Sequence, residues 1–357
     1  MLTPLGIIAA GFALRQFDRW WFSPARGRQF SGSVRAVMAL QRSRANNLTP
    51  VLLLVGHWLE LVGWWQLAAR TGPVGWGVVA LVTAVKFRHL QEVSHFTVHG
   101  VLTRDGALGT ALTEAMVHAP LGFVPVPVRR EKHVRQHHPN ATVAGVDPNL
   151  AELHRAGLCP EVGSGRFALA VVFPLTLGGL AHTCRGLAAN LDPRRACWLR
   201  LCLFTAVPLA LGVLLGWPAA VFGFLVPRFL FYPQLAWMSL LVEHRWFDAE
   251  RATGGPAVVE AARCLRLYPR NRVLALLARG TWLPYGDLFH YAHSVHPAVR
   301  WNYLPGLERG IGTPAYTPRG LLIGSSTVVA HHRRALADAR APGRTAGVTR
   351  PAARADE

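Results

Sequence analysis

Long apolar runs divide the chain into candidate membrane-spanning helices. A helix needs about 20 mostly apolar residues to cross a bilayer. The first such run is Val51 to Ala69, and Val74 to Val85 returns across the membrane after a Thr-Gly-Pro turn. A second pair of runs covers Trp198 to Trp217 and Pro218 to Val242. The pattern predicts an all-α, polytopic membrane protein with about four transmembrane helices in two hairpins.

Two further stretches are less apolar and are expected to be interfacial or re-entrant. Residues 107–128 are interrupted by Glu114, His118 and Pro120, and Phe167 to His182 contains Pro174. If Arg185 to Arg200 and His244 both lie on the cytoplasmic side, an even number of crossings separates them. The hairpin from 198 to 242 supplies these two crossings. A full crossing by Phe167 to His182 would break this parity, so that stretch is not expected to span.

Charge changes this picture by adding an orientation. The 357-residue chain has 38 Lys and Arg against 19 Asp and Glu, yet it is 51% hydrophobic and 16% charged. An apolar chain of this kind is neither a disordered basic tail nor a soluble nucleic-acid-binding protein, so no nucleic-acid partner is expected. The Arg-rich segments follow Val85 and lie around 129–130, around 194–195 and over 245–279. Positive residues favour the cytoplasmic side, and that side is where these segments are expected.

Composition also sets the expected boundaries. Residues 1–50 form an N-terminal cytoplasmic or interfacial segment, 51–310 the membrane domain, and 311–332 a C-terminal extension. Residues 333–357 are rich in Ala, Arg, Pro and Gly and are expected to be disordered. The N-terminus lacks a basic region before its apolar part, which argues against a cleaved signal peptide. The five cysteines form no C-x-x-C pair and are interpreted as packing residues.

The chain contains sixteen histidines, and most of them lie in short clusters. His95 and His99 form H-x-x-x-H, which places both rings on one helix face. His133, His137 and His138 form H-x-x-x-H-H. Two more clusters are Glu243-His244 and the H-x-x-H-x-x-H run of His290, His293 and His296. Every cluster follows a predicted membrane end on the side assigned as cytoplasmic, so a cytoplasmic histidine-rich cap is predicted.

Imidazole clusters without a cysteine partner are typical of iron, copper or zinc sites, whereas calcium and magnesium prefer oxygen ligands. Eight or nine imidazoles exceed the capacity of one ion, so two metal ions are expected. A carboxylate commonly orients a ligating histidine by accepting its second N–H. Glu243 and Asp147 are the best candidates for that role.

The order H-x-x-x-H, H-x-x-x-H-H, Glu-His, H-x-x-H resembles the membrane-bound fatty acid desaturase/hydroxylase superfamily, over roughly residues 50–310. Asp147-Pro148 and the run from His296 to Pro305 add to the likeness. The resemblance implies a non-haem di-iron centre that activates O₂. It also implies a lipid or acyl substrate and electrons from a ferredoxin, rubredoxin or cytochrome with its reductase. By position, it implies iron ligands, which are also the expected catalytic residues, at His95, His99, His133, His137, His138, His244, His290 and His293.

The chain departs from the superfamily at one place. We call the superfamily's histidine motifs boxes: the first here is His95 to His99, the second His133 to His138, and the third begins at His290. The third box of the superfamily usually ends in two adjacent histidines, and here Ser294 stands where the second of them is expected. Either the second iron has fewer ligands, or His296 ligates in its place, or the activity is lost. His296 is therefore included among the candidate metal ligands.

The remaining histidines are expected to be structural. His57 lies in the first span, where it is expected to pair with Glu60 one turn away. His89 lies off the face of His95. His118, His154 and His182 are isolated, and His331-His332 are expected to be solvated.

Three functional hypotheses follow. The favoured one is a lipid desaturase that introduces a double bond into an acyl chain. The second, within the same superfamily, is a hydroxylase or ketolase of a lipid, alkane or terpenoid. The third is a non-enzymatic membrane protein that binds metal or haem.

Overall fold

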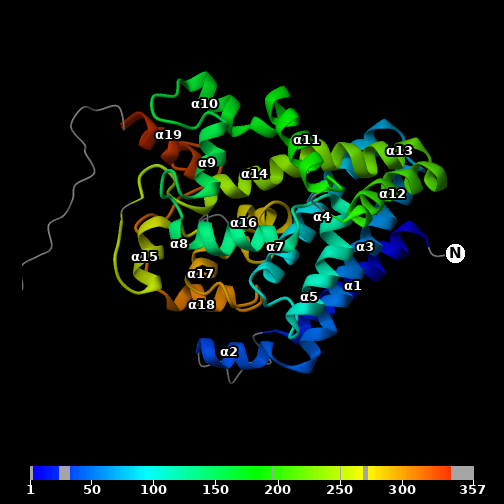
Figure 1. The fold of residues 1–357 in the computed structure, drawn as a ribbon, viewed down its shortest axis with the longest axis horizontal. Helices are drawn as coiled ribbons and strands as arrows, with labels where there is room; N and C mark the ends of the chain where they lie inside the picture. The colour runs from blue at the N-terminus through cyan, green and yellow to red at the C-terminus, as the bar shows by residue number, and fades with distance from the viewer. Residues whose placement is uncertain (1–2, 24–32, 195–196, 250, 268–271, 339–357) are drawn as a thin grey trace, which may run out of the picture.

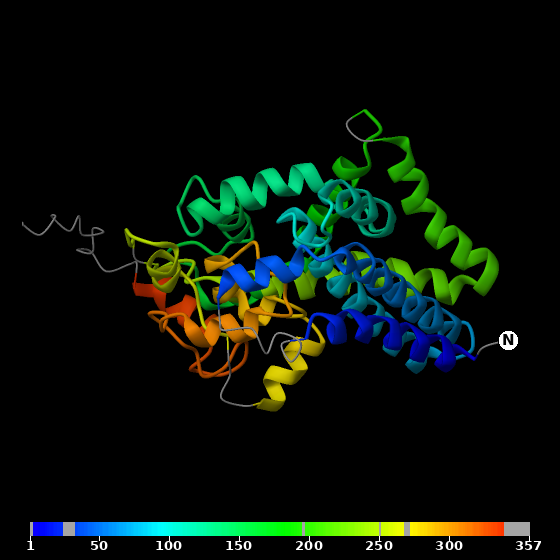
Figure 2. The same cartoon turned by 90° about the horizontal axis from the view of Figure 1, so that it is seen from below.

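The protein is helical throughout the part of the chain that the structure describes. The structure is a computed structural model, and it describes residues 3–23, 33–194, 197–249, 251–267 and 272–338. Within these ranges it contains isolated β-bridges but no strand. Long helices gather at one end of the molecule, and shorter helices and loops form the other end (Figures 1 and 2).

The long helices and the elements next to them in sequence come from residues 4–21, 34–98 and 198–243. Their bounds are α1 Pro4–Trp21, α2 Val34–Gln41, η1 Arg44–Asn47, α3 Thr49–Ala68, α4 Pro73–Val98, α12 Trp198–Leu215, α13 Trp217–Ala220, η5 Val221–Leu225, η6 Pro227–Phe231 and α14 Tyr232–Glu243.

The other elements are short. They are α5 Gly106–Thr113, η2 Glu114–His118, α6 Ala119–Leu121, α7 Val126–Arg130, η3 Glu131–His137, α8 His138–Asn140, α9 Pro148–Arg155, α10 Ser164–Val171, η4 Phe173–Leu175, α11 Leu177–Leu191, α15 Pro256–Arg263, α16 Arg272–Gly280, η7 Asp287–Phe289, α17 His290–Val295, α18 Leu304–Gly310 and α19 Val328–Asp338.

Among the described residues, three helices are long and apolar enough to cross a membrane. They are Arg44–Ala68, Trp198–Leu215 and Trp217–Glu243. Gly106–Leu121 and Val126–Asn140 form a bent pair with an angle of 96°, and the number rises to four if this pair is one broken span. The predicted span Val74 to Val85 is not among them. It belongs to α4, where Lys86 and Arg88 follow the apolar part directly.

The two hairpin turns lie at the same end of the molecule. Trp76, at the start of α4, has its ring 5.1 Å from that of Trp217 and 5.4 Å from that of Phe222. Its indole N–H donates to the Ala68 carbonyl, 3.0 Å away, at the end of α3. The turn between α3 and α4 and the turn between α12 and α13 are therefore neighbours, and the histidine clusters lie toward the opposite ends of α4 and α14.

Helix α1 packs closely along α3. A Cβ on Gly56 would lie 2.6 Å from the Gly11 carbonyl oxygen, and a Cβ on Gly11 would lie 2.5 Å from the Gly56 carbonyl oxygen. Small residues at a helix contact let the two backbones approach, as is common in membrane proteins. Much of the predicted N-terminal segment 1–50 is therefore part of the helix bundle, and residues 24–32 lie outside the described residues.

Side chains from other helices bind the carbonyl groups at the break between α6 and α7. Gly122 has a φ of +64°, which ends α6 in the left-handed region. Arg228 Nε donates to Leu121 O at 2.5 Å, Asn190 Nδ2 donates to Gly122 O at 3.1 Å, and Arg200 donates to the Phe123 carbonyl. A non-helical backbone at membrane depth is tolerated where such groups satisfy it. The predicted re-entrant character of 107–128 agrees with this bend.

The stretch Phe167 to His182 agrees with its prediction, whereas the C-terminal tail begins later than predicted. Phe167 to His182 is divided among α10, η4 and α11, so it does not form one long span. Helix α19 continues to Asp338, so residues 333–338 are helical where disorder was predicted. His332 and Leu336 are 1% and 2% exposed on this helix, and their burial accounts for the difference. Residues 339–357 lie outside the described residues.

The contact between α1 and α3 yields a stability prediction. Gly56→Ala forces a methyl group against the Gly11 backbone, and overpacking of this kind costs about 1–3 kcal/mol. The matched control is Gly77→Ala on α4, where a Cβ meets nothing within 4 Å. Thermal unfolding in detergent is expected to show a lower Tm for Gly56→Ala and an unchanged or higher Tm for Gly77→Ala. Equal Tm values would contradict the close packing.

Candidate metal centre

The polar second half of α4 presents the first histidine pair. Residues 86–98 of this helix are nearly all buried, although they include Lys86, Arg88, Glu92 and two histidines. His95 and His99 lie one turn apart, and their Nε2 atoms are 3.1 Å apart. The sequence prediction that these rings share a helix face is confirmed.

A π-helix sets the geometry of the second histidine box. Element η3 spans Glu131–His137, and the backbone N–H of His138 donates to the carbonyl of His133. In a π-helix, residues i and i+5 are joined by a backbone hydrogen bond, so His133 and His138 lie on the same side. The ring of His137 stacks on that of His133 with centroids 5.4 Å apart, but its ligand atoms belong to a different group of side chains.

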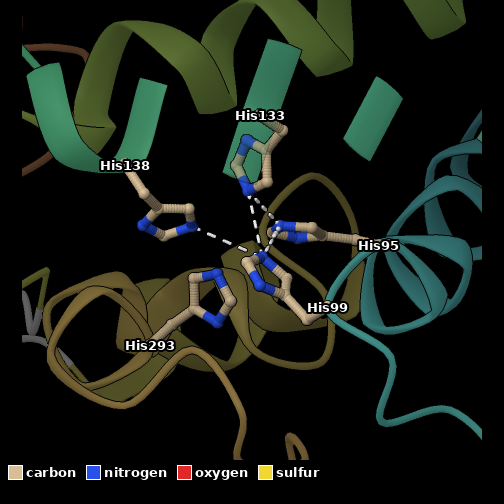
Figure 3. A group of neighbouring side chains, drawn as sticks. All are labelled: His95, His99, His133, His138 and His293. Atoms are coloured by element: carbon tan, nitrogen blue, oxygen red, sulfur yellow. Dashed lines mark hydrogen bonds between the residues drawn. The ribbon is translucent and has the colours of Figure 1, made fainter. Parts of the chain in front are cut away.

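Five imidazole rings meet in one group, which we call the first histidine group (Figure 3). His95 Nε2 lies 2.6 Å from His133 Nε2, and His99 Nε2 lies 3.1 Å from His133 Nε2 and 3.4 Å from His138 Nε2. One potential ligand atom from every ring lies within 4.8 Å of those from the others. The members of the first histidine group are His95, His99, His133, His138 and His293.

Three further rings form the second histidine group, which consists of His137, His244 and His290. His244 Nε2 lies 3.3 Å from His137 Nε2 and 3.2 Å from His290 Nε2. All three side chains are at most 2% exposed. His244 follows directly after α14 ends at Glu243, and its extended backbone forms a bridge with Cys264.

The second and third boxes each contribute to both groups. In the second box, His133 and His138 belong to the first histidine group and His137 to the second. In the third box, His293 belongs to the first group and His290 to the second, with ring centroids 5.9 Å apart. The two groups are therefore adjacent and are held by the same short helices.

Carboxylates fix the orientation of one ring in each group. Asp147 Oδ1 lies 2.9 Å from Nδ1 of His137, and both side chains are 1% exposed. Glu92 lies 3.1 Å from Nδ1 of His95. A ring that donates its Nδ1–H to a carboxylate has its Nε2 lone pair free for a metal. Asp147 was expected in this role, whereas Glu92 was passed over, although its spacing of three residues from His95 is a recognisable signal.

In the first histidine group, more ring nitrogens approach one another than hydrogen bonds between the rings can account for. With Nδ1 protonated, the Nε2 lone pair of His95 faces two other ring nitrogens at close range. Among the described residues, both ring nitrogens of buried His293 lack a hydrogen-bond partner. Nitrogens about 2.0–2.1 Å from one ion lie about 2.9 Å apart at a right angle and about 3.4 Å apart at a tetrahedral angle. The residues therefore fit a shared cation in chemistry and spacing.

Burial keeps these rings neutral. It lowers the pKa of His95, His133, His244 and His290 well below the ordinary value, and neighbouring imidazoles lower it further. For His293, burial lowers the pKa to about 3. Only the neutral form of imidazole ligates a metal, so the centre is set up for ligation rather than for holding charged histidines.

Ser294 lies beside the centre without joining either group. Its hydroxyl is buried and lies against the Cys264 thiol. His296 follows α17, which ends at Val295. Among the described residues, it belongs to no cluster of potential metal ligands. A carboxylate borders the second histidine group. Glu243 has a carboxylate oxygen within 4.8 Å of ligand atoms of His137 and His244.

Cys264 contacts the second histidine group from its outer side. Its Sγ lies 3.4 Å from His244 Nδ1 and 3.2 Å from a Glu260 carboxylate oxygen. Burial raises the pKa of this thiol well above its ordinary value, so the thiol is protonated and donates to Glu260. The sequence interpretation of Cys264 as a packing residue missed this contact, because it depends on α15 lying against the chain after α14.

Two expectations about the other histidines are wrong. His57 pairs with the Tyr285 hydroxyl at 2.5 Å rather than with Glu60, because Glu60 already binds Arg15 and Lys86. His332 is not solvated, because it lies 1% exposed with Nε2 2.8 Å from the Leu241 carbonyl.

The rings predicted to be structural have ordinary partners. His89 Nε2 lies 3.1 Å from the Gly280 carbonyl. His331, which was expected to be solvated, is half-buried and binds Asp248. His118 binds the hydroxyl of Ser94, and His182 lies 3.4 Å from Glu152.

A cavity of about 530 Å³ opens beside the centre. His95, His133 and His290 line it, so both histidine groups border the same space. Its wall also includes Arg88, which forms an ion pair with Asp287 and lies 3.6 Å from Glu92. The volume is within the range of about 300–1,000 Å³ that small-molecule sites occupy.

Comparison with known proteins agrees with this geometry. No curated protein matches the sequence. The family model described as fatty acid desaturase matches residues 71–323, a range that contains both histidine groups and the cavity. Members of this family oxidise lipids by desaturase- or hydroxylase-type chemistry, and the histidine groups and membrane-length helices are consistent with it. The chain belongs to the fatty acid desaturase family.

Proposed function

We propose that this protein is a membrane-bound, non-haem di-iron desaturase that uses O₂ to introduce a double bond into a lipid acyl chain. One observation carries the proposal: eight histidines from four separate parts of the chain converge in two adjacent groups beside one cavity. A protein that only binds zinc or haem would not need two imidazole-rich groups. It would also not need second and third histidine boxes that each contribute to both groups. Bound iron would supply the oxidising power that an unactivated C–H bond requires.

The ligand assignment follows the two groups. One iron would be held by His95, His99, His133, His138 and His293. The other would be held by His137, His244 and His290, with the Glu243 carboxylate as the available fourth donor. In this assignment Glu243, and not His296, supplies the ligand that the missing histidine at position 294 would have supplied. Carboxylates accompany imidazoles in many non-haem iron sites.

The protein contributes orientation and a suitable electrostatic environment. Glu92 and Asp147 hold their histidines in the tautomer that presents Nε2, and burial, which lowers the pKa of His95, keeps that ring neutral. The Arg88–Asp287 pair, which also binds the Ser239 hydroxyl, joins α4, α14 and η7 directly beside the centre. The cavity wall then holds the substrate in register with the two histidine groups.

The same proposal places the centre on the cytoplasmic side and assigns an external electron donor. Arg129 and Arg130, and Arg245 at the start of the Arg-rich segment 245–279, lie near the histidine groups rather than near the hairpin turns. A ferredoxin, rubredoxin or cytochrome-type protein with its reductase would deliver the electrons. Positive residues at the cytoplasmic end support this orientation.

The first prediction concerns the product. Cells that express the protein are expected to accumulate a lipid that has lost two hydrogen atoms, which mass spectrometry detects. Desaturation and hydroxylation begin with the same hydrogen abstraction, and a gain of one oxygen atom would instead assign a hydroxylase. The control is the His133→Ala variant. A product that is equally abundant in this variant would overturn the proposed site.

The second prediction concerns metal content. Elemental analysis of purified protein is expected to find about two iron ions per chain, because each histidine group has enough donors for one. His133→Ala and His137→Ala are each expected to lose iron. His154→Ala is the matched control, since His154 is exposed and outside both groups. Stoichiometric zinc or haem without iron would contradict a di-iron enzyme.

The third prediction tests the orientation of His137. Asp147→Asn removes the carboxylate that accepts from its Nδ1, and loss of such a partner typically weakens metal binding about 10–100-fold. Iron release to a chelator is therefore expected to be faster in this variant. Asp105→Asn serves as the control, because Asp105 caps α5 and Asn caps a helix equally well. Identical release from both variants would exclude the orienting role.

A further inference from the structure

A row of aromatic side chains leads away from the first histidine group. The centroid of the Phe96 ring lies 5.8 Å from that of His95 and 6.0 Å from that of His293. Phe96 also lies 4.7 Å from Trp301, whose ring is 5.4 Å from that of Tyr285. Each step is within the distances at which aromatic rings contact one another. Tyr285 is therefore connected to the first histidine group through two intervening rings.

The backbone next to Tyr285 packs directly on this row. Phe96 is fully buried, and Trp301 is 7% exposed. A Cβ on Gly286 would lie 2.8 Å from Cζ of Phe96 and 3.0 Å from Cδ1 of Leu304. Only a residue without a side chain allows the loop to approach the ring this closely. Rings in contact of this kind let an electron pass between them in short steps.

The Tyr285 hydroxyl ends the row at a proton acceptor. It lies 2.5 Å from Nε2 of His57, a ring that is fully buried in α3. Arg15 donates a second hydrogen bond to this hydroxyl, and a guanidinium can only donate. The hydroxyl is thus free to donate its own proton to His57. Burial raises the pKa of Tyr285 to about 12, so the resting phenol keeps that proton.

The surroundings of His57 make a transfer of this proton reversible. A neutral imidazole with its hydrogen on Nδ1 presents the Nε2 lone pair to the phenol, and imidazole commonly takes up and releases protons in proteins. Arg15 and Lys86 lie close to the ring, and both bind the Glu60 carboxylate. Because the cluster already contains two cations, a proton on His57 is held weakly and returns readily to the phenol oxygen.

We propose that Tyr285 is a redox-active residue that gives one electron to the oxidised metal centre, through Trp301 and Phe96, when no lipid occupies the cavity. The phenol loses one electron and its O–H proton and becomes a neutral tyrosyl radical. The electron passes to the oxidised iron, which is reduced by one electron, and Nε2 of His57 gains the proton. The external electron donor later restores the electron, and His57 returns the proton.

This route gives the oxidant an alternative to its own ligands. An oxidant strong enough for an unactivated C–H bond attacks nearby side chains when that bond is missing, and the protein has to exclude such competing reactions. A phenol that loses an electron becomes a much stronger acid, so its proton moves along the hydrogen bond that already joins it to His57. The inference rests on the proposed function, because iron that has reacted with O₂ is the oxidant in this step.

The test detects the radical rather than a lipid product. Purified protein with reduced iron is mixed with O₂ in the absence of lipid and frozen rapidly, and its electron paramagnetic resonance spectrum is recorded. A tyrosyl signal is expected. Its hyperfine splitting is expected to narrow in protein labelled with ring-deuterated tyrosine and to stay unchanged with deuterated tryptophan. A protein that binds iron and consumes O₂ without any tyrosyl signal would overturn the inference.

Variants then assign the signal to one tyrosine. Tyr285→Phe is expected to abolish it. Tyr316→Phe is the matched control, because Tyr316 is also half-buried beside a histidine, with its ring stacked 4.3 Å from that of His331, and it is not part of the row. A signal that survives in Tyr285→Phe, or that both variants reduce equally, would overturn the inference.

His57→Gln tests the proton transfer and keeps Tyr285 in place, so it remains informative if Tyr285→Phe does not fold. The amide accepts a hydrogen bond but does not take up a proton. The tyrosyl signal is therefore expected to be lost while the iron content stays the same. A signal of full intensity in this variant would contradict the role of His57.

The outcomes are distinct from those that test the enzyme. A tyrosyl radical in a protein that oxidises no lipid would contradict the proposed function alone. Lipid oxidation by a protein that forms no radical would contradict this inference alone. A protein that holds no iron would contradict both, and elemental analysis of the same samples identifies that case.

Discussion

The mutual approach of eight imidazole rings is the constraint on which the rest of this structure depends. Ring nitrogens 2.6–3.4 Å apart, several with lone pairs facing one another, repel unless a cation lies between them. In a buried setting that repulsion is poorly screened. The surrounding structure must therefore hold the rings together, and it does so with two carboxylates, a π-helix and the extended backbone at His244.

Buried charged side chains stabilise the elements around the histidine rings at two places. Arg88 and Asp287 join three elements beside the centre. Arg200 and Arg228 bind carbonyls at the break between α6 and α7, which carries the chain toward the second box. The sequence contains far more arginine than lysine, and the guanidinium is the side chain suited to binding several oxygen atoms at once. Much of the positive charge near the centre is therefore structural.

The sequence predicted the helical fold, most membrane-length helices and the histidine boxes, because these follow from local apolar runs and short spacings. It did not predict which histidines share a group. That division depends on the π-helix at 131–137, and no residue type there distinguishes a π-helix from an α-helix. The partner of His57 was also missed, since Tyr285 is remote in sequence and reaches it only through tertiary packing. His332 was assigned to solvent for the same reason.

The most direct test of the central claim is a diffraction measurement at the iron absorption edge, on crystals of the purified protein. The account predicts two anomalous peaks, one among His95, His99, His133, His138 and His293 and the other among His137, His244 and His290. A single peak, or iron outside these two groups, would contradict it.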